Sequence, residues 1–316
     1  MKISMIIVSI LLVTFTSSIH QASAQYGAAD KDIIKAYSSL WKGDRFPDGR
    51  PKVPDDILER MKKVEIEEAW SVLQQHGFTF QFEGDWNNLH PERTLVGRAL
   101  TATFVPKRPD LNAITDSIGF SHGRGRQGGQ NNWIIDQVSS QDVIVVNLFG
   151  KIINASFVGG NLSTAVKSKG GNGLVIDGGI RDLDQIFRIN DFNLYIRGAN
   201  PTGNSEITLD GINIPTRIGQ ATCMPGDVVL GKREGVIFIP AHLAEEVVKN
   251  SERIRLVDMF GFKRLEEGVY TAGEIDSRWS DKIEKDFTQW LRENSGNLPV
   301  PKNTIEEWVK EREKGK

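Results

Sequence analysis

The sequence predicts a mixed α/β domain with three layers, α/β/β, and helical segments at both ends. Short runs of branched apolar residues recur between residues 95 and 240, which is typical of buried strands. The earlier runs alternate with helical stretches, which favours parallel pairing, whereas the later runs follow one another through tight turns, which favours antiparallel pairing. The segments outside this range are polar and have helical periodicity.

Composition limits the classes of function. The chain has 316 residues, of which 39% are hydrophobic and 25% are charged, enough for one globular domain with extensions or for two small domains. With 39 Lys and Arg against 41 Asp and Glu, the formal net charge is -2, so a surface built to bind nucleic acid is not expected. We therefore expect a small molecule or a protein as the partner.

Residues 1–24 have the parts of a secretory signal peptide. Lys2 supplies the positive charge, residues 3–15 form the apolar core, and Ala22–Ala24 give a small-residue cleavage pattern before Gln25. Because the apolar core is short for a membrane span, we expect cleavage, export to the periplasm and no stable membrane span after cleavage. An uncleaved N-terminal anchor is the alternative.

Helical extensions are expected on both sides of the domain, at residues 25–90 and 249–316. In the first, a loop at 43–54 precedes a helix at 55–77, which Asp55 or Asp56 caps and Gly77 ends. Most apolar positions of this helix lie on one stripe that must pack on another element, and they are Ile57, Met61, Val64, Ala69, Val72 and Leu73. The C-terminal tail is amphipathic and contains Trp279, Trp290 and Trp308.

Residues 91–248 form the predicted central α/β domain. Strands are expected at 95–105, 142–150, 173–179, 192–198, 212–219, 227–231 and 235–240. Short helices are expected at 162–169 and 183–189, between the earlier strands.

The segment FVGGNLST, residues 157–164, predicts an anion-binding turn. Gly159 and Gly160 leave their backbone amides unshielded, and the helix that follows points further N–H groups and its positive dipole end the same way. A glycine-rich turn without a ligand is the alternative for such a pair taken alone.

A second turn ends the strand GLVIDGG, and it carries Arg181 and Asp182. The alternative role for this pair is structural, with Asp182 as the N-cap of the next helix and Arg181 as its solvated or ion-paired neighbour. However, Gly159 and Gly160 lie 21–22 residues before Arg181, the length of one helix plus one strand. Both turns can therefore open at one edge of the sheet, where amides, a guanidinium and a carboxylate could hold a small keto acid on a divalent metal.

An ordered set of motifs runs through the central domain: LVGRALTATF at 95–104, GGNL at 159–162, GLVIDGGIRDLDQI at 173–186, YIRGANPTG at 195–203 and IPTRIGQATCMPGDVVLGKREGVIFIP at 214–240. In this order they resemble the RraA-like family, named for regulators of RNase E activity. That family also contains 4-hydroxy-4-methyl-2-oxoglutarate and 4-carboxy-4-hydroxy-2-oxoadipate aldolases, which are metal-dependent lyases with oxaloacetate decarboxylase activity. The resemblance covers about half of the chain.

The resemblance implies a fold and a set of roles. The fold is a three-layer α/β/β domain of the swivelling type, assembled as a homotrimer or hexamer. Asp182 would bind Mg²⁺ or Mn²⁺ with several waters, and Arg181 would hold the pyruvyl group, so these two are the implied catalytic residues. The turn from Gly159 through Gly160 and Asn161 to Leu162 would supply amides to the substrate carboxylate. The implied reaction cleaves a 2-oxo acid through a pyruvate enolate, and the alternative is a non-catalytic protein that binds a regulated partner.

One departure concerns the substrate. Many aldolases of the family have an acidic residue in this turn, where the present chain has Gly160 and Asn161. The particular aldol substrate is therefore left open, and the sequence identifies no general base.

Other candidates are weaker. The segment SHGRGRQGGQNN, residues 121–132, is either a mobile lid over an anionic ligand or a flexible surface loop. The five histidines show no metal-binding spacing, so a zinc site is not expected. Cys223 is the single cysteine, which excludes an internal disulfide and is typical of a buried small residue. Glu206 is a candidate second carboxylate near a strand end.

Overall fold

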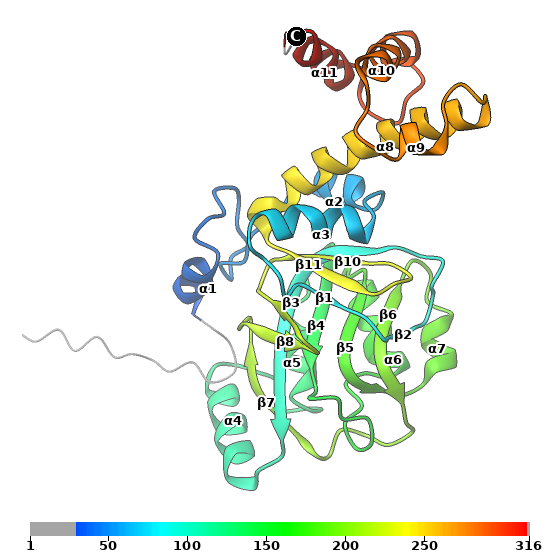
Figure 1. Cartoon of the computed structure of the whole chain (residues 1–316). Helices are drawn as coiled ribbons and strands as arrows, with labels where there is room; N and C mark the ends of the chain where they lie inside the picture. Colours follow the sequence, from blue (N-terminus) through cyan, green and yellow to red (C-terminus); the bar gives the residue numbers. More distant parts are fainter. Residues whose placement is uncertain (1–29, 315–316) are drawn as a thin grey trace, which may run out of the picture.

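The computed structural model describes residues 30–314 (Figure 1). The predicted signal peptide, residues 1–24, lies outside the described residues, so its cleavage stays a prediction. A mixed sheet forms the centre of the molecule, with short helices packed on one face and a small second sheet on the other. The predicted α/β/β architecture with helical extensions is confirmed.

Nine strands of the described chain form the main sheet, in the order β1-β11-β10-β3-β4-β5-β6-β2, with β7 paired to β3. Its parallel part is β3 (Leu95–Pro106), β4 (Asp142–Asn147), β5 (Gly173–Ile180) and β6 (Asn193–Ala199). Its antiparallel part is β1 (Phe82–Glu83), β2 (Asn87–Asn88), β7 (Ile207–Ile212), β10 (Val228–Gly231) and β11 (Val236–Ile239). The split between parallel and antiparallel strands follows the predicted change in the connections.

The layers follow from the alternation of side chains along the buried strands. On β5, Leu174 and Ile176 face the helices, whereas Val175 faces the second sheet. The helical layer contains α4 (Pro109–Ser121), α5 (Asn131–Ile135), α6 (Gly160–Ser168) and α7 (Leu183–Phe187). The second sheet is the hairpin of β8 (Thr216–Ile218) and β9 (Ala221–Cys223). Since β5 is covered on both faces, it is apolar almost throughout.

The prediction of one continuous helix at 55–77 is wrong. The structure has α2 (Asp55–Met61) and α3 (Ile66–Gln75), because Glu65 starts a new helix through a capping box in which its amide donates to Glu68 Oε2 at 2.8 Å. The N-cap of α2 is Pro54, and its side chain makes no capping bond, so neither predicted aspartate caps it. The predicted apolar stripe is nevertheless buried throughout.

The strand predicted at 212–219 is also divided. Ile212 ends β7, Asn213 turns the chain with a φ of 56°, and β8 begins at Thr216. A left-handed residue cannot continue a strand, so the run of apolar residues serves two sheets. Strands β7 and β9 and helices α4 and α5 were not predicted, nor were β1 and β2, which lie in the segment 25–90 that was expected to be helical.

The N-terminal segment is joined to the sheet by a buried ion pair. After α1 (Lys31–Tyr37), the loop at 43–54 places Arg50 with 0% exposure against Asp142, the first residue of β4. The guanidinium donates to both carboxylate oxygens of Asp142, at 3.1 and 3.0 Å. It also donates to Asp48 at 2.7 Å, so the buried charge is fully paired.

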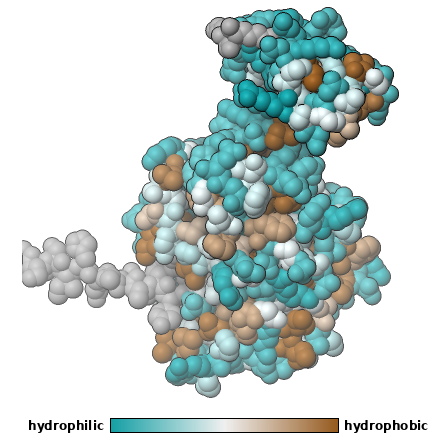
Figure 2. All heavy atoms as spheres, in the orientation of Figure 1, coloured by the Kyte–Doolittle hydropathy of each residue, from teal (hydrophilic) through white to brown (hydrophobic). Residues whose placement is uncertain are grey.

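The C-terminal segment forms a separate helical lobe. Helix α8 (Ala244–Glu266) starts against α2 and α3 and runs away from the sheet to carry α9 (Ala272–Ile275), α10 (Asp281–Asn294) and α11 (Lys302–Lys314) (Figure 1). This lobe has its own core, which includes Leu256, Phe260, Phe287, Trp290 and Ile305. Polar side chains cover most of its visible surface (Figure 2). Within residues 30–314, no helix combines the length and the apolar character that a membrane crossing needs.

Candidate functional site

The two predicted turns meet in the structure. The segment that leads into α6 runs beside the end of β5, because the amide of Phe157 donates to the carbonyl of Gly179 at 3.0 Å and the amide of Arg181 donates to that of Val158 at 3.1 Å. The glycine turn and the Arg181–Asp182 pair therefore lie at one edge of the sheet, as their spacing predicted.

Asp182 connects the two turns through its side chain. It stands at the N-cap position of α7, but its side chain makes no capping bond to that helix. Instead, Oδ2 accepts a hydrogen bond from the backbone amide of Gly160, the first residue of α6, at 3.1 Å. The alternative prediction that the side chain of Asp182 caps α7 is therefore wrong, because the carboxylate bonds to the first turn of α6 instead. Asp182 is left-handed, with a φ of 60°, which costs a non-glycine residue about 1 kcal/mol.

Arg181 flanks the same carboxylate. Its Nε lies 3.7 Å from Asp182 Oδ2, and the two side chains are 50% and 36% exposed. A β-carbon on Gly159 would collide with Asp182 Oδ2 and lie 3.0 Å from Arg181 Nε. Gly159 has ordinary extended backbone angles, so glycine is needed here for close approach rather than for its backbone freedom.

The first turn of α6 offers two further donors. The N-cap of this helix is Gly159, which has no side chain to satisfy the amides of the first turn. The amide of Gly160 donates to Asp182 Oδ2. The amides of Asn161 and Leu162 have no carbonyl partner four residues earlier in the helix. Asn161 is exposed and Leu162 is partly exposed, so a ligand can approach them. A carboxylate is already held at this positive dipole end, with two amides beside it.

Gln185 also belongs to this group. Its amide donates to the carbonyl of Asp182 at 3.0 Å, and its side chain lies over Gly160. A β-carbon on Gly160 would lie 3.0 Å from Gln185 Cβ and would collide with Oε1. The motifs in the sequence did not single out Gln185. Its position three residues after Asp182, on the helix that follows, was the one sequence feature that could have indicated its place near the site.

A second charged network lies beneath the site, on the other face of β5. Arg197 donates through Nε to Asp177 at 2.7 Å and through Nη2 to Glu83 at 2.5 Å, and its guanidinium lies 3.9 Å from the centre of the Trp86 ring. Burial lowers the pKa of Arg197, but the two carboxylates outweigh it and the net pKa is raised. This network ties the ends of β5 and β6 to β1.

The remaining sequence candidates lie elsewhere or are otherwise engaged. Glu206 accepts from Lys151 Nζ and Asn154 Nδ2, each at 2.8 Å, and these contacts hold the pKa of its carboxyl below the usual value. It is therefore paired with neither Arg181 nor Asp182. Burial raises the pKa of the Cys223 thiol, so this cysteine is a core residue.

The segment at 121–132 is anchored rather than free. Trp133 Nε1 donates to the carbonyl of Gly125 at 3.0 Å, and Gln130 Oε1 accepts from the amide of Leu209 at 2.7 Å. The segment forms part of the wall of a 240 Å³ cavity, together with Asn112, Asp116 and Asn204. These contacts hold the segment at Gly125 and Gln130, so they favour neither the mobile lid nor the flexible surface loop that the sequence left open.

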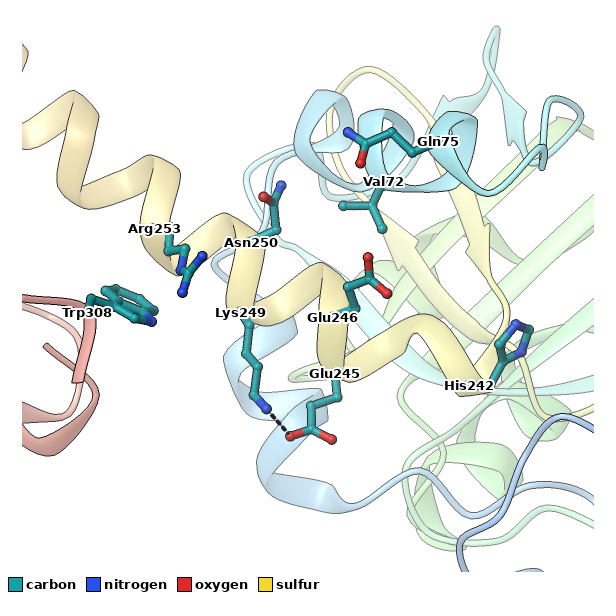
Figure 3. Close-up of a pocket in the computed structure, with 9 residues that line it drawn as sticks. All are labelled: Val72, Gln75, His242, Glu245, Glu246, Lys249, Asn250, Arg253 and Trp308. Atoms are coloured by element: carbon teal, nitrogen blue, oxygen red, sulfur yellow. Dashed lines mark ion pairs between the residues drawn. The ribbon is translucent and has the colours of Figure 1, made fainter. Parts of the chain in front are cut away.

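A larger pocket, of 540 Å³, lies between α3, α8 and α11 (Figure 3). Figure 3 shows Glu246 directed toward Gln75 and Val72, and Arg253 directed toward Trp308. The acids are paired, Glu245 with Lys249 at 2.7 Å and Glu246 with His76 at 3.0 Å. None of these helices carries Arg181 or Asp182.

No preformed cage for a metal is found in the part of the chain that the structure describes. Within residues 30–314, no three His, Cys, Asp or Glu side chains lie close enough together to hold an ion. A divalent cation at Asp182 would therefore take at most two of its ligands from such side chains and the rest from water or substrate.

Comparisons with known proteins agree on one family. The model of the RraA-like family, described as Aldolase/RraA, matches residues 56–238. A protein of Halalkalibacterium halodurans that carries the provisional name 4-hydroxy-4-methyl-2-oxoglutarate aldolase is 30% identical over 173 residues, which cover 54% of this chain and 80% of that protein. An uncharacterized protein of Methanocaldococcus jannaschii is 30% identical over 167 residues, covering 53% and 71% of the two chains.

Solved structures show the same fold. RraAS2 of Streptomyces coelicolor, described as an unusual member of the RNase ES inhibitor RraA protein family, has a TM-score of 0.53 and 23% identity, over 70% of this chain and 97% of that one. An uncharacterized protein from Pseudomonas syringae has a TM-score of 0.58 and 22% identity, over 74% and 99%. Since the family model covers residues 56–238 of 316, more than half of the sequence, the chain belongs to the RraA-like family.

Proposed function

We propose that this chain is a divalent-metal-dependent lyase, of the aldolase or decarboxylase type, that cleaves 2-oxo acids through a pyruvate enolate. The hydrogen bond between Asp182 Oδ2 and the Gly160 amide carries the proposal, because it joins a carboxylate, a guanidinium and a helix N-terminus in one site. The aldolase name of a relative that is 30% identical supports it. Arg181 and Asp182 are the proposed catalytic residues.

The surroundings of Asp182 fit Mg²⁺ or Mn²⁺ as the cofactor. One carboxylate oxygen is held by the Gly160 amide, whereas the other accepts no hydrogen bond from the described residues. Mg²⁺ prefers hard oxygen ligands and keeps several waters, so one protein carboxylate is a sufficient anchor. When bound, such an ion supplies Lewis-acid polarisation of a 2-oxo group.

Arg181 and the first turn of α6 would hold the substrate. A 2-oxo acid presents a carboxylate next to a ketone oxygen, and the amides of Asn161 and Leu162 can donate to that carboxylate. The guanidinium of Arg181 would face the oxygen on which negative charge develops. Because Gly159 and Gly160 have no side chains, the backbone of this turn can come close to the substrate. A substrate carboxylate and Asp182 repel each other, so cations are required between them.

The first test is pyruvate release from oxaloacetate with and without EDTA. We expect release above that of a protein-free mixture with the same Mg²⁺ or Mn²⁺, and we expect this excess to stop when EDTA is added. An excess over the protein-free mixture that continues in EDTA, after dialysis against it, would contradict the metal-dependent reaction.

A non-catalytic binding protein is the second candidate. The exposure of Arg181 and Asp182 on the described surface favours it, because a surface site can also meet a protein partner. A folded chain that releases no pyruvate from oxaloacetate or from 4-hydroxy-4-methyl-2-oxoglutarate with either metal would favour this second role.

Assembly and export belong to the same proposal. The family resemblance supports a homotrimer or hexamer, which light scattering on the purified protein would detect as three or six times the monomer mass. The sequence of the N-terminal segment supports export to the periplasm, and mature protein should begin at Gln25 by N-terminal sequencing. Retention of Met1 would contradict cleavage.

A further inference from the structure

We propose that Gln185 is a positioning residue for a divalent cation held at Asp182, and that it helps to set the affinity for that cation. The inference rests on the proposed function, because it assumes that Asp182 binds a metal. It concerns a different residue, whose contribution can be measured separately.

The carboxylate of Asp182 and the carboxamide of Gln185 enclose the same residue, Gly160, from two directions. Asp182 Oδ2 accepts the amide hydrogen of Gly160 at 3.1 Å. Gln185 covers the Cα of Gly160. A β-carbon added to Gly160 would lie 3.0 Å from both Cβ and Cδ of Gln185 and would collide with Oε1. The two polar groups are therefore neighbours across one glycine.

The backbone fixes this arrangement. The amide of Gln185 donates to the carbonyl of Asp182 at 3.0 Å and closes the turn in which Asp182 is left-handed. The amide of the next residue, Ile186, donates to the same carbonyl at 3.2 Å, and its buried side chain fixes which face of α7 is turned toward the core. Gln185 is thus presented to Gly160 by a rigid element.

Charge decides from which side a cation can approach. Arg181 lies on the Gly159 side of the carboxylate, with Nε 3.7 Å from Asp182 Oδ2, and its positive charge repels a second cation. Gln185 lies on the Gly160 side and is neutral. A divalent ion on the side of Gln185 avoids the guanidinium, and there it meets only the partial positive charge of the α6 N-terminus, whose Gly160 amide Asp182 already accepts.

A carboxamide suits that position chemically. Its oxygen is a hard acceptor that can receive a hydrogen bond from a water on Mg²⁺ or Mn²⁺, and its nitrogen can donate to a ligand oxygen. Groups that orient metal-bound ligands in this way contribute about 10- to 100-fold to metal affinity.

The test measures Mn²⁺ binding directly, by the EPR signal of free Mn²⁺, in the full chain without substrate. Gln185→Leu keeps a side chain over Gly160 but removes the polar atoms, and we expect a Kd about 10- to 100-fold higher. Gln185→Glu adds a negative charge beside Asp182, so its Kd should fall below that of the wild type at low ionic strength. A purely packing role would leave the Kd of Gln185→Leu unchanged, whereas the lower Kd of Gln185→Glu tests only that residue 185 lies near the bound ion.

Two further variants distinguish a failure of the proposed role of Gln185 from a failure of the proposed metal site at Asp182. Gln289→Leu, an exposed glutamine on α10, is the matched control and should bind Mn²⁺ as the wild type does. If Asp182→Asn abolishes binding while both Gln185 variants bind normally, the role of Gln185 is wrong and the metal site stands. If the wild type binds no Mn²⁺, or Asp182→Asn binds it unchanged, both proposals fail. Melting temperatures would confirm that all variants are folded.

Discussion

The carboxylate of Asp182 and the backbone amide of Gly160, 22 residues apart in the chain, form a hydrogen bond of 3.1 Å. The bond gives Asp182 a structural task, because it satisfies an amide of α6 that the N-cap glycine cannot satisfy. It also leaves the second carboxylate oxygen available at the surface. The variants described next separate these two tasks.

Asp182→Asn should leave the fold intact and remove the metal-dependent activity. Asparagine caps a helix about as well as aspartate, so its side-chain oxygen can still accept from Gly160, but it lacks the charge that attracts a divalent ion. We expect pyruvate release from oxaloacetate to be lost or to require far more Mg²⁺. Asp184→Asn, which removes a neighbouring exposed acid, should behave as the wild type. Full turnover of the Asp182 variant at low Mg²⁺ would contradict the assignment.

Arg181→Lys tests whether the guanidinium aligns the substrate or is only a surface charge. Lysine keeps the charge but loses the planar fork, so the alignment of a keto acid and the stabilisation of its developing charge should both suffer. We expect kcat/KM for oxaloacetate to fall roughly 30- to 1,000-fold, equivalent to about 2–4 kcal/mol. Arg188→Lys, at the end of α7, is the matched control. A normal kcat/KM with a normal melting temperature would show that Arg181 is not a catalytic residue.

Gly159→Ala should disturb the site without removing any of its charges. The added methyl group collides with Asp182 Oδ2 and crowds Arg181 Nε, whereas the backbone angles of residue 159 suit alanine. Displacing catalytic groups by about 1 Å costs roughly 100-fold in rate, so activity should fall by at least that factor. Gly273→Ala adds a methyl group to open space and is the control. An active Gly159 variant would show that the close approach is not needed.

Asp227 should make the stability of the wild type depend on pH. Burial raises the pKa of its carboxyl from 3.8 to about 7 in the folded chain. Between these values the folded state keeps a proton that the unfolded state releases, so this contribution is complete below pH 3.8 and is lost as the pH rises to 7. The slope is about 1.4 kcal/mol of unfolding free energy per pH unit.

The measurement is urea unfolding of the wild type and Asp227→Asn at several pH values from 5 to 8. Asparagine can still accept from the Met224 amide, as Asp227 does at 2.8 Å, but it does not titrate. The stability of the variant relative to the wild type should therefore rise with pH. Asp210→Asn, on an exposed position of β7, should show no such trend. Parallel pH profiles for wild type and Asp227→Asn would refute the raised pKa.

The parts of the fold that local sequence determines were predictable. The parallel strands are continuous apolar runs because both of their faces are covered, and the glycines mark the turns after them. Helix α4 was missed because its buried residues include Thr115 and Gly119, which give no apolar stripe. The break between α2 and α3 depends on two glutamates, Glu65 and Glu68, in a stretch where the apolar stripe continues.

The candidate site was likewise predictable only in part. The spacing of the glycine turn and of Arg181 predicted their proximity, since one helix and one strand return the chain to the same sheet edge. The alternative role of Asp182, as the N-cap of α7, rested on a bond between sequence neighbours, but the backbone at Asp182 is left-handed and its side chain bonds to α6. The contact of Arg197 with Glu83 spans 114 residues, and no local pattern encodes it.

The buried pair of Arg50 and Asp142 determines when the N-terminal segment can fold. These residues are 92 positions apart, and both side chains are wholly shielded from water. A guanidinium enters such an environment only once its carboxylate is in place, because an unpaired buried charge costs several kcal/mol. Although Arg50 is synthesised before Asp142, it must wait for β4, so the loop at 43–54 can acquire this native contact only after residue 142 has been made.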